Sequence, residues 1–302
     1  MIKKIIKILL IVFLIIIVVI FYLSIFGIKT DKFNNQISNS ILKINERIDL
    51  NLIDVNYLLN PYNFTINIKT TNPRILLDGK SLDIKNIQTN VALKSLINDQ
   101  FIIDDLEIIT RELKVNDVIA LLRVFQNSTK LFVLNTFIKD GFINANINLN
   151  FDEKGNIKKN YKIEGSVKKV KLNTLNQVKL ENLNFNFYIN KSAYLLKKID
   201  VKLNNIKVTS PLIEITKKNN FFFVNGQFFN NKKNFDIENL KSIFTNLFKD
   251  TDIRKIEFSS VNNFSFNINK SLKLDKLKVE SIIDLKQLIV KHNDLDLKAY
   301  FP

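Results

Sequence analysis

The sequence predicts a mostly β protein: a long, twisted antiparallel sheet curled into an open groove, with an N-terminal transmembrane helix and a few short amphipathic helices. Three observations indicate this. The chain opens with an uncharged apolar run, alternates apolar with polar residues over most of its length, and shows helical spacing in only a few short stretches. We expect a cytoplasmic start and anchor over residues 1–29, an amphipathic helix over 30–49, and a β-rich groove domain over 50–302 that continues in a longer protein.

The N-terminal run predicts a membrane anchor. The 21 residues from Ile8 to Ile28 carry no charge, and at about 1.5 Å per helical residue they can cross a hydrocarbon core of about 30 Å. A cleaved signal peptide is the alternative, but its apolar core is shorter and ends in small residues. Tyr22, Leu23 and Phe26 occupy that place here, which favours an uncleaved anchor.

The flanking charges predict the orientation. Lys3, Lys4 and Lys7 precede the apolar run, whereas Lys29, Asp31 and Lys32, of mixed sign, follow it. Because basic residues are retained in the cytoplasm, we expect a single-pass inner-membrane protein with a cytoplasmic N-terminus and the bulk of the chain in the periplasm.

The composition excludes some classes of partner and site. The net charge is +16 and the isoelectric point is near 9.7, but lysines are spread singly along the alternating segments. A nucleic-acid site gathers its basic residues into a patch, so we expect no nucleic-acid partner. The absence of cysteine excludes disulfides, thiolate metal sites and cysteine nucleophiles.

Helical spacing follows the anchor and then gives way to a period of two. The apolar residues of the helix expected over 30–49, capped by Thr30 or Asp31, are Phe33, Ile37, Ile41, Ile44 and Ile48. From about residue 50 the alternating positions predict strands, with a break at Asn60-Pro61-Tyr62-Asn63. These positions include Leu50, Leu52, Phe64, Ile66, Ile68, Leu82, Ile84, Leu106, Ile108, Ile143, Ile147, Leu149, Ile163, Val167, Leu183, Phe185, Phe187, Ile189, Ile199, Val201, Leu203, Phe264, Phe266, Ile268, Leu274, Leu277, Val279, Leu295 and Leu297.

Two stretches interrupt the strands with helical spacing. One covers Val118 to Phe125 after Asn116, and the other covers Ile237 to Phe248 after Asp236. The Asn and Asp residues are expected N-caps, and both helices are expected to cover the sheet as lids or end pieces.

A short pattern recurs inside the alternating segments. Two alternating apolar residues, two polar residues and one more apolar residue occur in 82–87, 178–183 and 272–277. This spacing reverses the parity of the strand, so it predicts a β-bulge or tight bend in each copy.

Candidate catalytic and metal-binding groups are few. The only histidine, His292, lies where the strand parity changes, which predicts a turn rather than a metal ligand. Asp104 and Asp105, with Glu107 nearby, could do acid–base chemistry, but neighbouring strand residues point to opposite faces. Phosphate-binding loops and hydrolase motifs are absent from the sequence, so we expect no enzyme, no cofactor and no metal site.

Phenylalanine is abundant, with 25 residues, and recurs as alternate pairs such as Phe185 with Phe187, Phe221 with Phe223, and Phe264 with Phe266. A sandwich core is one explanation for these pairs. An apolar face with few helices to cover it, on a chain tethered to a membrane, is the other, and acyl chains would then fill the groove.

Several passages together resemble the N-terminal part of the AsmA-like family of bacterial envelope proteins, which are similar to chorein-type bridge lipid-transfer proteins. The resemblance rests on the basic start, the anchor and the helix after it, and on Asn72-Pro73-Arg74-Ile75, Leu82-Asp83-Ile84-Lys85-Asn86-Ile87, Leu93-Lys94-Ser95-Leu96 and residues 101–108, and it continues from 138–141 to 224–226. It implies an inner-membrane anchor that carries a U-shaped β-sheet, along whose apolar concave face phospholipids move toward the outer membrane. It implies no catalytic residues.

The expected function is therefore to shield and guide phospholipid for outer-membrane lipid transport. The expected partners are phospholipid acyl chains, the inner membrane and other envelope proteins. The alternative is a structural or assembly factor for envelope proteins that acts by β-strand augmentation. The candidate lipid-facing residues are Ile66, Ile68, Ile84, Ile108, Ile147, Leu149, Phe185, Phe187, Val201, Leu203, Phe266 and Ile268.

Overall fold

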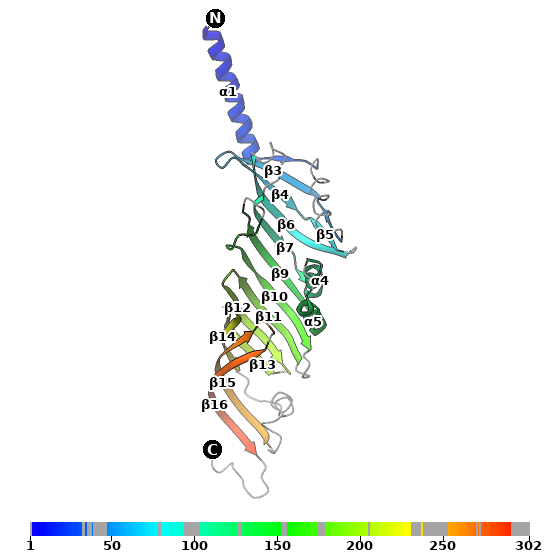
Figure 1. The fold of residues 1–302 in the computed structure, drawn as a ribbon, viewed down its shortest axis with the longest axis vertical. Helices are drawn as coiled ribbons and strands as arrows, with labels where there is room; N and C mark the ends of the chain where they lie inside the picture. Colours follow the sequence, from blue (N-terminus) through cyan, green and yellow to red (C-terminus); the bar gives the residue numbers. More distant parts are fainter. Residues whose placement is uncertain are drawn as a thin grey trace. The chain divides into compact units, whose positions relative to one another are not determined.

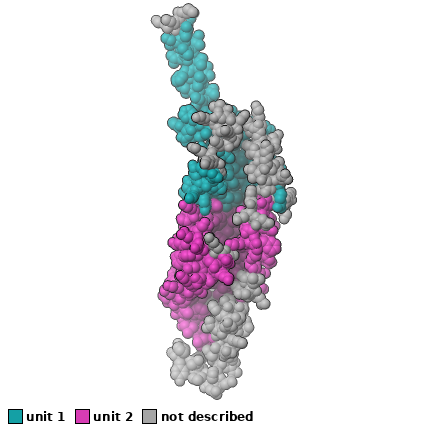
Figure 2. All heavy atoms as spheres, in the orientation of Figure 1, with its two compact units in different colours: residues 1–112, 145–162 teal, residues 113–144, 163–302 magenta. Residues whose placement is uncertain are grey.

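The computed structural model describes residues 2–31, 34, 38, 47–77, 80–93, 103–125, 128–152, 156–173, 179–204, 206–230, 237, 253–269, 271 and 273–290. The chain divides into two compact units, coloured separately in Figure 2. Unit 1 comprises residues 1–112 and 145–162, and unit 2 comprises residues 113–144 and 163–302. Each unit is described by itself.

The helices and strands follow in chain order, and most of them are labelled in Figure 1. Unit 1 contains α1 (Ile2–Ile25), β1 (Ile28–Lys29), β2 (Ile48–Asn51), β3 (Asp54–Asn60), β4 (Thr65–Thr71), β5 (Arg74–Leu77), β6 (Lys80–Ala92) and β7 (Ile103–Thr110). Unit 2 contains β8 (Leu113–Lys114), α4 (Val115–Phe125), α5 (Thr129–Phe137), β10 (Lys162–Asn173, whose first residue belongs to unit 1), β11 (Lys179–Ile189), β12 (Ala193–Leu203), β13 (Ile206–Lys217), β14 (Phe221–Asn230), β15 (Ile253–Asn269) and β16 (Leu274–Val290). Strand β9 (Ile138–Asn150) contributes residues to both units.

The strands form one large sheet that does not close into a barrel. Its order is β1-β3-β4-β6-β7-β9-β10-β11-β12-β13-β14-β15-β16. Off this path β2 pairs with β5, β5 also pairs with β6, and β8 pairs with β9. The pairings of known register are antiparallel and mostly join strands that follow each other in the chain. The prediction of a mostly β, antiparallel meander is confirmed.

Helix α1 contains the predicted apolar run. Its segment Lys4–Ile25 is long and apolar enough to cross a membrane. The helix ends at Ile25, three residues before the predicted end, because Gly27 adopts a positive φ of 66° and turns the chain into β1. Ile28 then pairs with Tyr57 of β3, so only Phe26 and Gly27 separate the end of α1 from β1.

Most of the helix expected over 30–49 lies outside the described residues, although Asn34 and Ser38 are helical. The expectation fails at its end. Ile48 begins strand β2 and pairs with Leu77, so a tertiary partner overrides the helical spacing there. The helix expected over 237–248 is described only at Ile237, which is helical, and the strand expected at 295–297 is outside the described part.

Helix α4 confirms the first predicted interruption, but its cap differs from the expectation. The helix begins at Val115, so Asn116 lies in its first turn and its Nδ2 donates to the Ile138 carbonyl at 3.4 Å. Helix α5 was not expected from the sequence. Its N-cap is Ser128, whose side chain accepts a hydrogen bond from the Lys130 amide.

The buried core is thin. In unit 1 it centres on Val55, Ile68 and Val91, with Leu52 packed against them. In unit 2 a smaller cluster forms where Ile206 packs with residues of β13 and β15. The largest fully buried side chain in the described part of the chain is that of Val91, so no described phenylalanine or tyrosine is completely enclosed.

The recurring sequence pattern coincides with irregularities in the sheet, as predicted. In the first copy the register shifts between Ile84 and Asn86, and in the other two copies Asn182 and Lys276 adopt positive φ. Lys169 and Lys198 also adopt positive φ, so three consecutive strands, β10 to β12, each contain such a residue. A strand residue with positive φ interrupts the strict alternation, so the side chains before it and after it are out of phase by one residue.

We predict that Gly141→Ala destabilises unit 2. Gly141 has a φ of 135°, and a Cβ atom there would lie 2.3 Å from Val170 Cγ2 and 2.7 Å from Val170 Cα. The strained backbone alone costs about 1–3 kcal/mol. The urea midpoint of the full chain in mild detergent should fall. Lys139→Ala, at an exposed position of the same strand, should change the free energy of unfolding by less than about 0.5 kcal/mol and so leave the midpoint nearly unchanged. Equal midpoints for the two variants would contradict the prediction.

Candidate functional site

The pairing register places apolar side chains on one face of the sheet in unit 1. Directly paired residues of antiparallel strands share a face, so each row of paired residues can be followed across several strands. We call this the unit 1 apolar face. Its rows are Leu59, Ile66, Val91 and Ile103; Tyr57, Ile68, Thr89, Leu106 and Leu149; and Val55, Thr70, Ile87, Ile108 and Ile147.

The unit 1 apolar face is buried at one end and partly exposed at the other. Val55, Ile68 and Val91 on β3, β4 and β6 belong to the core. Burial also raises the pKa of the Tyr57 phenol above its ordinary value of 10.0. On β7 and β9 the side chains of Leu106, Ile108, Ile147 and Leu149 are only partly covered. We call these four residues the β7–β9 strip.

The opposite face of unit 1 is polar and hydrogen-bonded across strands. Asn67 Nδ2 donates to Asn90 Oδ1 at 2.8 Å, and Asn90 Nδ2 donates to Asp105 Oδ2 at 2.7 Å. The Asn90 amide also donates to Asp105 Oδ1 at 2.8 Å, so both carboxylate oxygens of Asp105 are engaged. These contacts link β4, β6 and β7 and mark this face as the polar side of an amphipathic sheet.

Unit 2 repeats the separation of faces over more strands. Ile215 pairs with Tyr194 and Val224, whereas the next residue along β13, Glu214, pairs with Leu195 and Asn225. We call the first side the unit 2 apolar face. Its rows are Ile163, Ile189, Tyr194, Ile215, Val224 and Phe266; Gly165, Phe187, Leu196, Ile213, Gly226, Phe264 and Val279; and Val167 with Phe185.

Aromatic rings pack along the unit 2 apolar face. The rings of Phe264 and Phe266 are stacked at 5.9 Å, and those of Phe185 and Phe187 meet edge to face at 6.5 Å. Gly226 makes room for this packing, because a Cβ atom there would lie 2.9 Å from Phe264 Cζ. The third expected pair, Phe221 and Phe223, shares the other face, since Phe222 between them pairs with Ile268.

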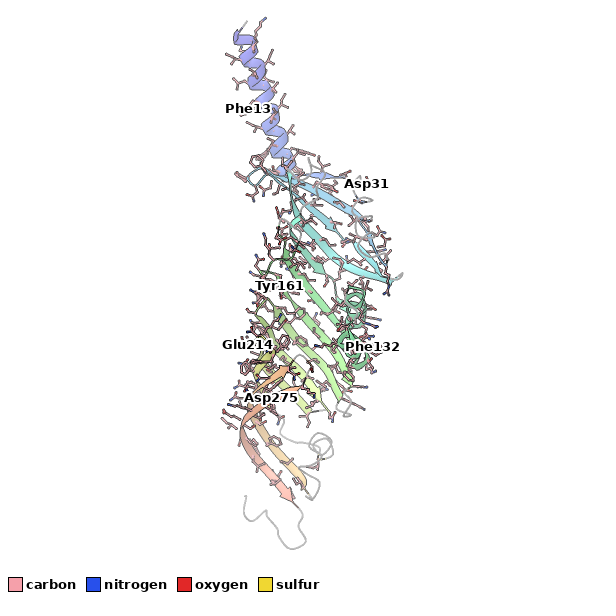
Figure 3. All side chains as sticks on the ribbon, viewed as in Figure 1. Phe13, Asp31, Phe132, Tyr161, Glu214 and Asp275 are labelled. Atoms are coloured by element: carbon pink, nitrogen blue, oxygen red, sulfur yellow. The ribbon has the colours of Figure 1, made fainter. Side chains whose placement is uncertain are left out.

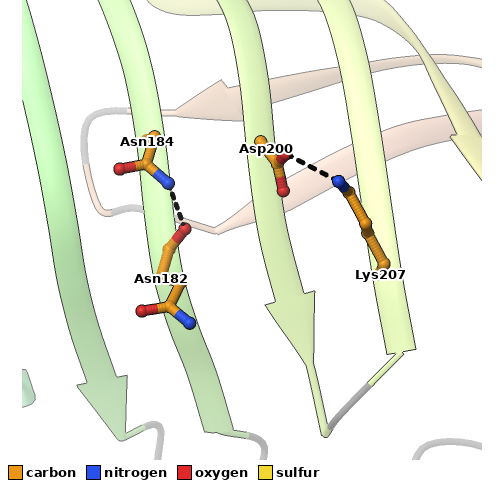
Figure 4. A network of polar contacts seen from close by, with 4 residues as sticks. All are labelled: Asn182, Asn184, Asp200 and Lys207. Carbon is orange, nitrogen blue, oxygen red and sulfur yellow. Dashed lines mark hydrogen bonds and ion pairs between the residues drawn. The ribbon is translucent and has the colours of Figure 1, made fainter.

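The polar side of unit 2 carries charged and amide side chains. In Figure 4 Asp200 forms an ion pair with Lys207 at 3.0 Å, and Asn184 Nδ2 donates to the Asn182 carbonyl at 2.6 Å. Glu214, labelled in Figure 3, lies on this side. These charged side chains therefore lie opposite the unit 2 apolar face, where Lys217 at the end of β13 shares the parity of Ile213 and Ile215.

The structure brings most of the predicted lipid-facing residues onto these faces. Eight of the twelve are partly exposed: Ile66, Ile108, Ile147, Leu149, Phe185, Leu203, Phe266 and Ile268. The other four, Ile68, Ile84, Phe187 and Val201, are buried within the protein, so they present little surface to a ligand. The prediction did not include Ile213 and Ile215, although Ile213-Glu214-Ile215 alternates as the others do.

Of the acidic residues singled out from the sequence, Asp105 and Glu107 lie two residues apart on β7 and share the polar face of unit 1. Asp105 is held by Asn90, while Asp104 is exposed and its carbonyl accepts a hydrogen bond from the Phe151 amide. In the described ranges no group of three or more His, Asp or Glu side chains could hold a metal ion. His292 lies outside those ranges.

The last strand of the sheet order, β16, is unusually exposed. It pairs with β15, and none of the strands that the structure describes pairs with its other edge. Its apolar side chains Leu277, Val279, Ile282 and Ile283 are all exposed, with Ile282 at 74%. A long edge strand of this kind can accept another strand.

We predict that Asn90→Ala loosens the polar face of unit 1. Asp105 loses its side-chain donor and Asn67 its acceptor, a change that costs about 1–3 kcal/mol for partly buried groups. Amide hydrogen exchange in β6 and β7 should accelerate. Asn63→Ala, in an exposed turn, is the matched control and should leave exchange in these strands unchanged. Unchanged protection in Asn90→Ala would show that this ladder does not stabilise the sheet.

Comparisons with protein-family models, with curated proteins and with solved structures give no match to this chain. The resemblance to the AsmA-like family therefore stays a prediction.

Proposed function

We propose that this protein is a membrane-anchored, non-catalytic lipid carrier of the cell envelope, which shields phospholipid acyl chains on the apolar faces of its open sheet. The observation that carries the proposal is that one face of each unit is apolar over many strands and remains partly exposed. The β7–β9 strip and the unit 2 apolar face both have this character.

The physical basis is apolar burial without a tight site. Each methylene that leaves water contributes about 0.8 kcal/mol, so ten methylenes on the face contribute on the order of 8 kcal/mol before ordering costs. The rows offer aliphatic and aromatic side chains and no charged group. A chain bound this way has similar affinity at successive positions, which permits it to slide.

The anchor supports the same proposal. Helix α1 passes through Gly27 into β1, which pairs with β3, so the sheet of unit 1 begins where the proposed membrane span ends. With the basic residues Lys3, Lys4 and Lys7 held in the cytoplasm, the sheet lies in the periplasm. Phospholipid of the inner membrane is then the adjacent source, and the outer membrane is the destination.

We predict that lipid crosslinks to one face of each strand and not to the other. A benzophenone-bearing amino acid replaces Ile108 or Glu107 in unit 1, and Ile215 or Glu214 in unit 2. These neighbouring, partly exposed residues point to opposite faces. After irradiation in cells, mass spectrometry should detect phospholipid adducts at Ile108 and Ile215 and far fewer at Glu107 and Glu214. Equal yields within each pair, or none at all, would exclude the proposal.

A second candidate function is β-strand augmentation, and the exposed edge of β16 is the observation that favours it. It predicts protein adducts, rather than lipid adducts, when the photoreactive group replaces Ile282. It also predicts that a charge on the β7–β9 strip, such as Ile147→Asp, leaves lipid distribution between the membranes unchanged.

A further inference from the structure

The hairpin that joins β3 to β4 presents two aromatic rings at its tip. Tyr62 is 94% exposed and Phe64 is 73% exposed. Asn60 Oδ1 fixes the turn by accepting hydrogen bonds from the amides of Tyr62 at 3.2 Å and Asn63 at 3.4 Å. Phe64 adopts a φ of 51°, which is rare for a bulky residue. The rings are therefore held outward by a built turn.

This hairpin is also free of charge. The 14 residues from Val55 to Ile68 include no Asp, Glu, Lys or Arg, although these make up 25% of the chain. The polar positions of the hairpin are Asn and Thr. Exposed tyrosine without nearby charge is typical of the boundary between lipid and water, where the ring can bury its apolar body and keep its hydroxyl hydrated. A neighbouring exposed phenylalanine adds apolar surface that the lipid can bury.

The hairpin lies beside the last turns of α1. A pocket of about 590 Å³ is lined on one side by Ile17, Phe21 and Ile25 and on the other by Leu58 to Tyr62. In Figure 1 the C-terminal end of α1 meets β3, and the β1–β3 pairing at Ile28 and Tyr57 fixes this arrangement within unit 1. The rings of Tyr22 and Phe26 are in tilted contact near the same end of the helix, with their centroids 5.2 Å apart.

The length of α1 determines how deep the hairpin must lie. From Ile17 to Ile25 the helix rises about 12 Å, and this is the part that lines the pocket. If the hairpin lay wholly in water, only residues 4–16 would remain to cross the membrane. They span about 20 Å, which is too short for a core of about 30 Å. A full span therefore requires the tip of the hairpin to enter the bilayer surface.

We propose that the β3–β4 tip inserts into the outer-facing interface of the same bilayer that α1 spans, as a second membrane contact carried by Tyr62 and Phe64. This inference rests on the anchor of the proposed function. Its partner is the lipid bilayer itself, and its physical basis is the burial of two uncharged aromatic rings. With α1 it fixes the orientation of unit 1 at the membrane surface.

The test uses the absence of tryptophan from the chain, so a single introduced tryptophan reports its own surroundings. Tyr62→Trp and, separately, Phe64→Trp are made in the full chain and reconstituted into phosphatidylcholine vesicles whose acyl chains are brominated near the headgroup. Both should show blue-shifted emission and quenching by the brominated lipid. Ile53→Trp is the matched control, because Ile53 is exposed just before β3, about 23 Å along that strand from the tip, and should be quenched by aqueous iodide instead.

Phe13→Trp, in the middle of α1, distinguishes the two possible failures. It is measured in matching vesicles whose acyl chains are brominated near their ends, at the bilayer centre. If Phe13→Trp is quenched there but Tyr62→Trp and Phe64→Trp are not quenched by bromine near the headgroup, the anchor stands and the inference is overturned. If Phe13→Trp is also unquenched, α1 does not span the bilayer, and both the anchor and the inference fail.

Discussion

The structure depends on one constraint: an open antiparallel sheet whose side chains alternate must place its apolar half on one face, and that face needs a cover. In a β-sandwich a second sheet provides the cover. Here the described strands belong to a single sheet, and its apolar faces are only partly buried. Rows such as Tyr194, Ile215 and Val224 run across strands without a charge. In the proposed function, acyl chains cover the partly exposed part of these faces.

The irregularities of the sheet preserve this separation of faces. In strands of 11 or 12 residues that alternate strictly, one extra residue would reverse the faces for the rest of the strand. Positive φ at Lys169 and Asn182 offsets the alternation once in β10 and once in β11, and Val170 and Leu183 are again paired beyond it. The bulges therefore correct the parity, so that apolar residues spaced by three keep to one face.

The sequence was sufficient to predict elements that depend on local pattern. The alternation identified most strands, the helical spacing identified α4, and the recurring pattern located three bulges. Elements that depend on a distant partner were not predicted. Ile28 and Ile48 form strands because Tyr57 and Leu77 pair with them, and nothing near either residue indicates this. Helix α5 has apolar residues on all sides, so only its cap, Ser128, could have indicated it.

The candidate surface, too, could be predicted only in part from the sequence. Alternation assigns a residue to a face, but it does not say what covers that face. Ile66 and Ile68 are equivalent in the sequence, yet Ile68 is buried in the core with Val55 and Val91 while Ile66 is partly exposed. Ile84 and Val201 are buried as well. In each unit the partly exposed part of the apolar face lies on strands that follow these buried residues in the sheet order. Which residues lie there is determined by the pairing register of the strands, and the composition does not indicate it.

The most direct test of the central claim is the accessibility of two neighbouring residues on β9 to oxygen and to a water-soluble nickel complex. A spin label replaces Leu149, in the β7–β9 strip, or Asn148, on the polar face, in the full chain purified with and without phospholipid. If acyl chains cover this face, the label at Leu149 should be reached by oxygen and shielded from nickel when lipid is present, and should become accessible to nickel when lipid is removed. The label at Asn148 should be accessible to nickel in both states. Low accessibility of Leu149 to both reagents, unchanged by lipid, would show that polypeptide covers this face and would contradict the account.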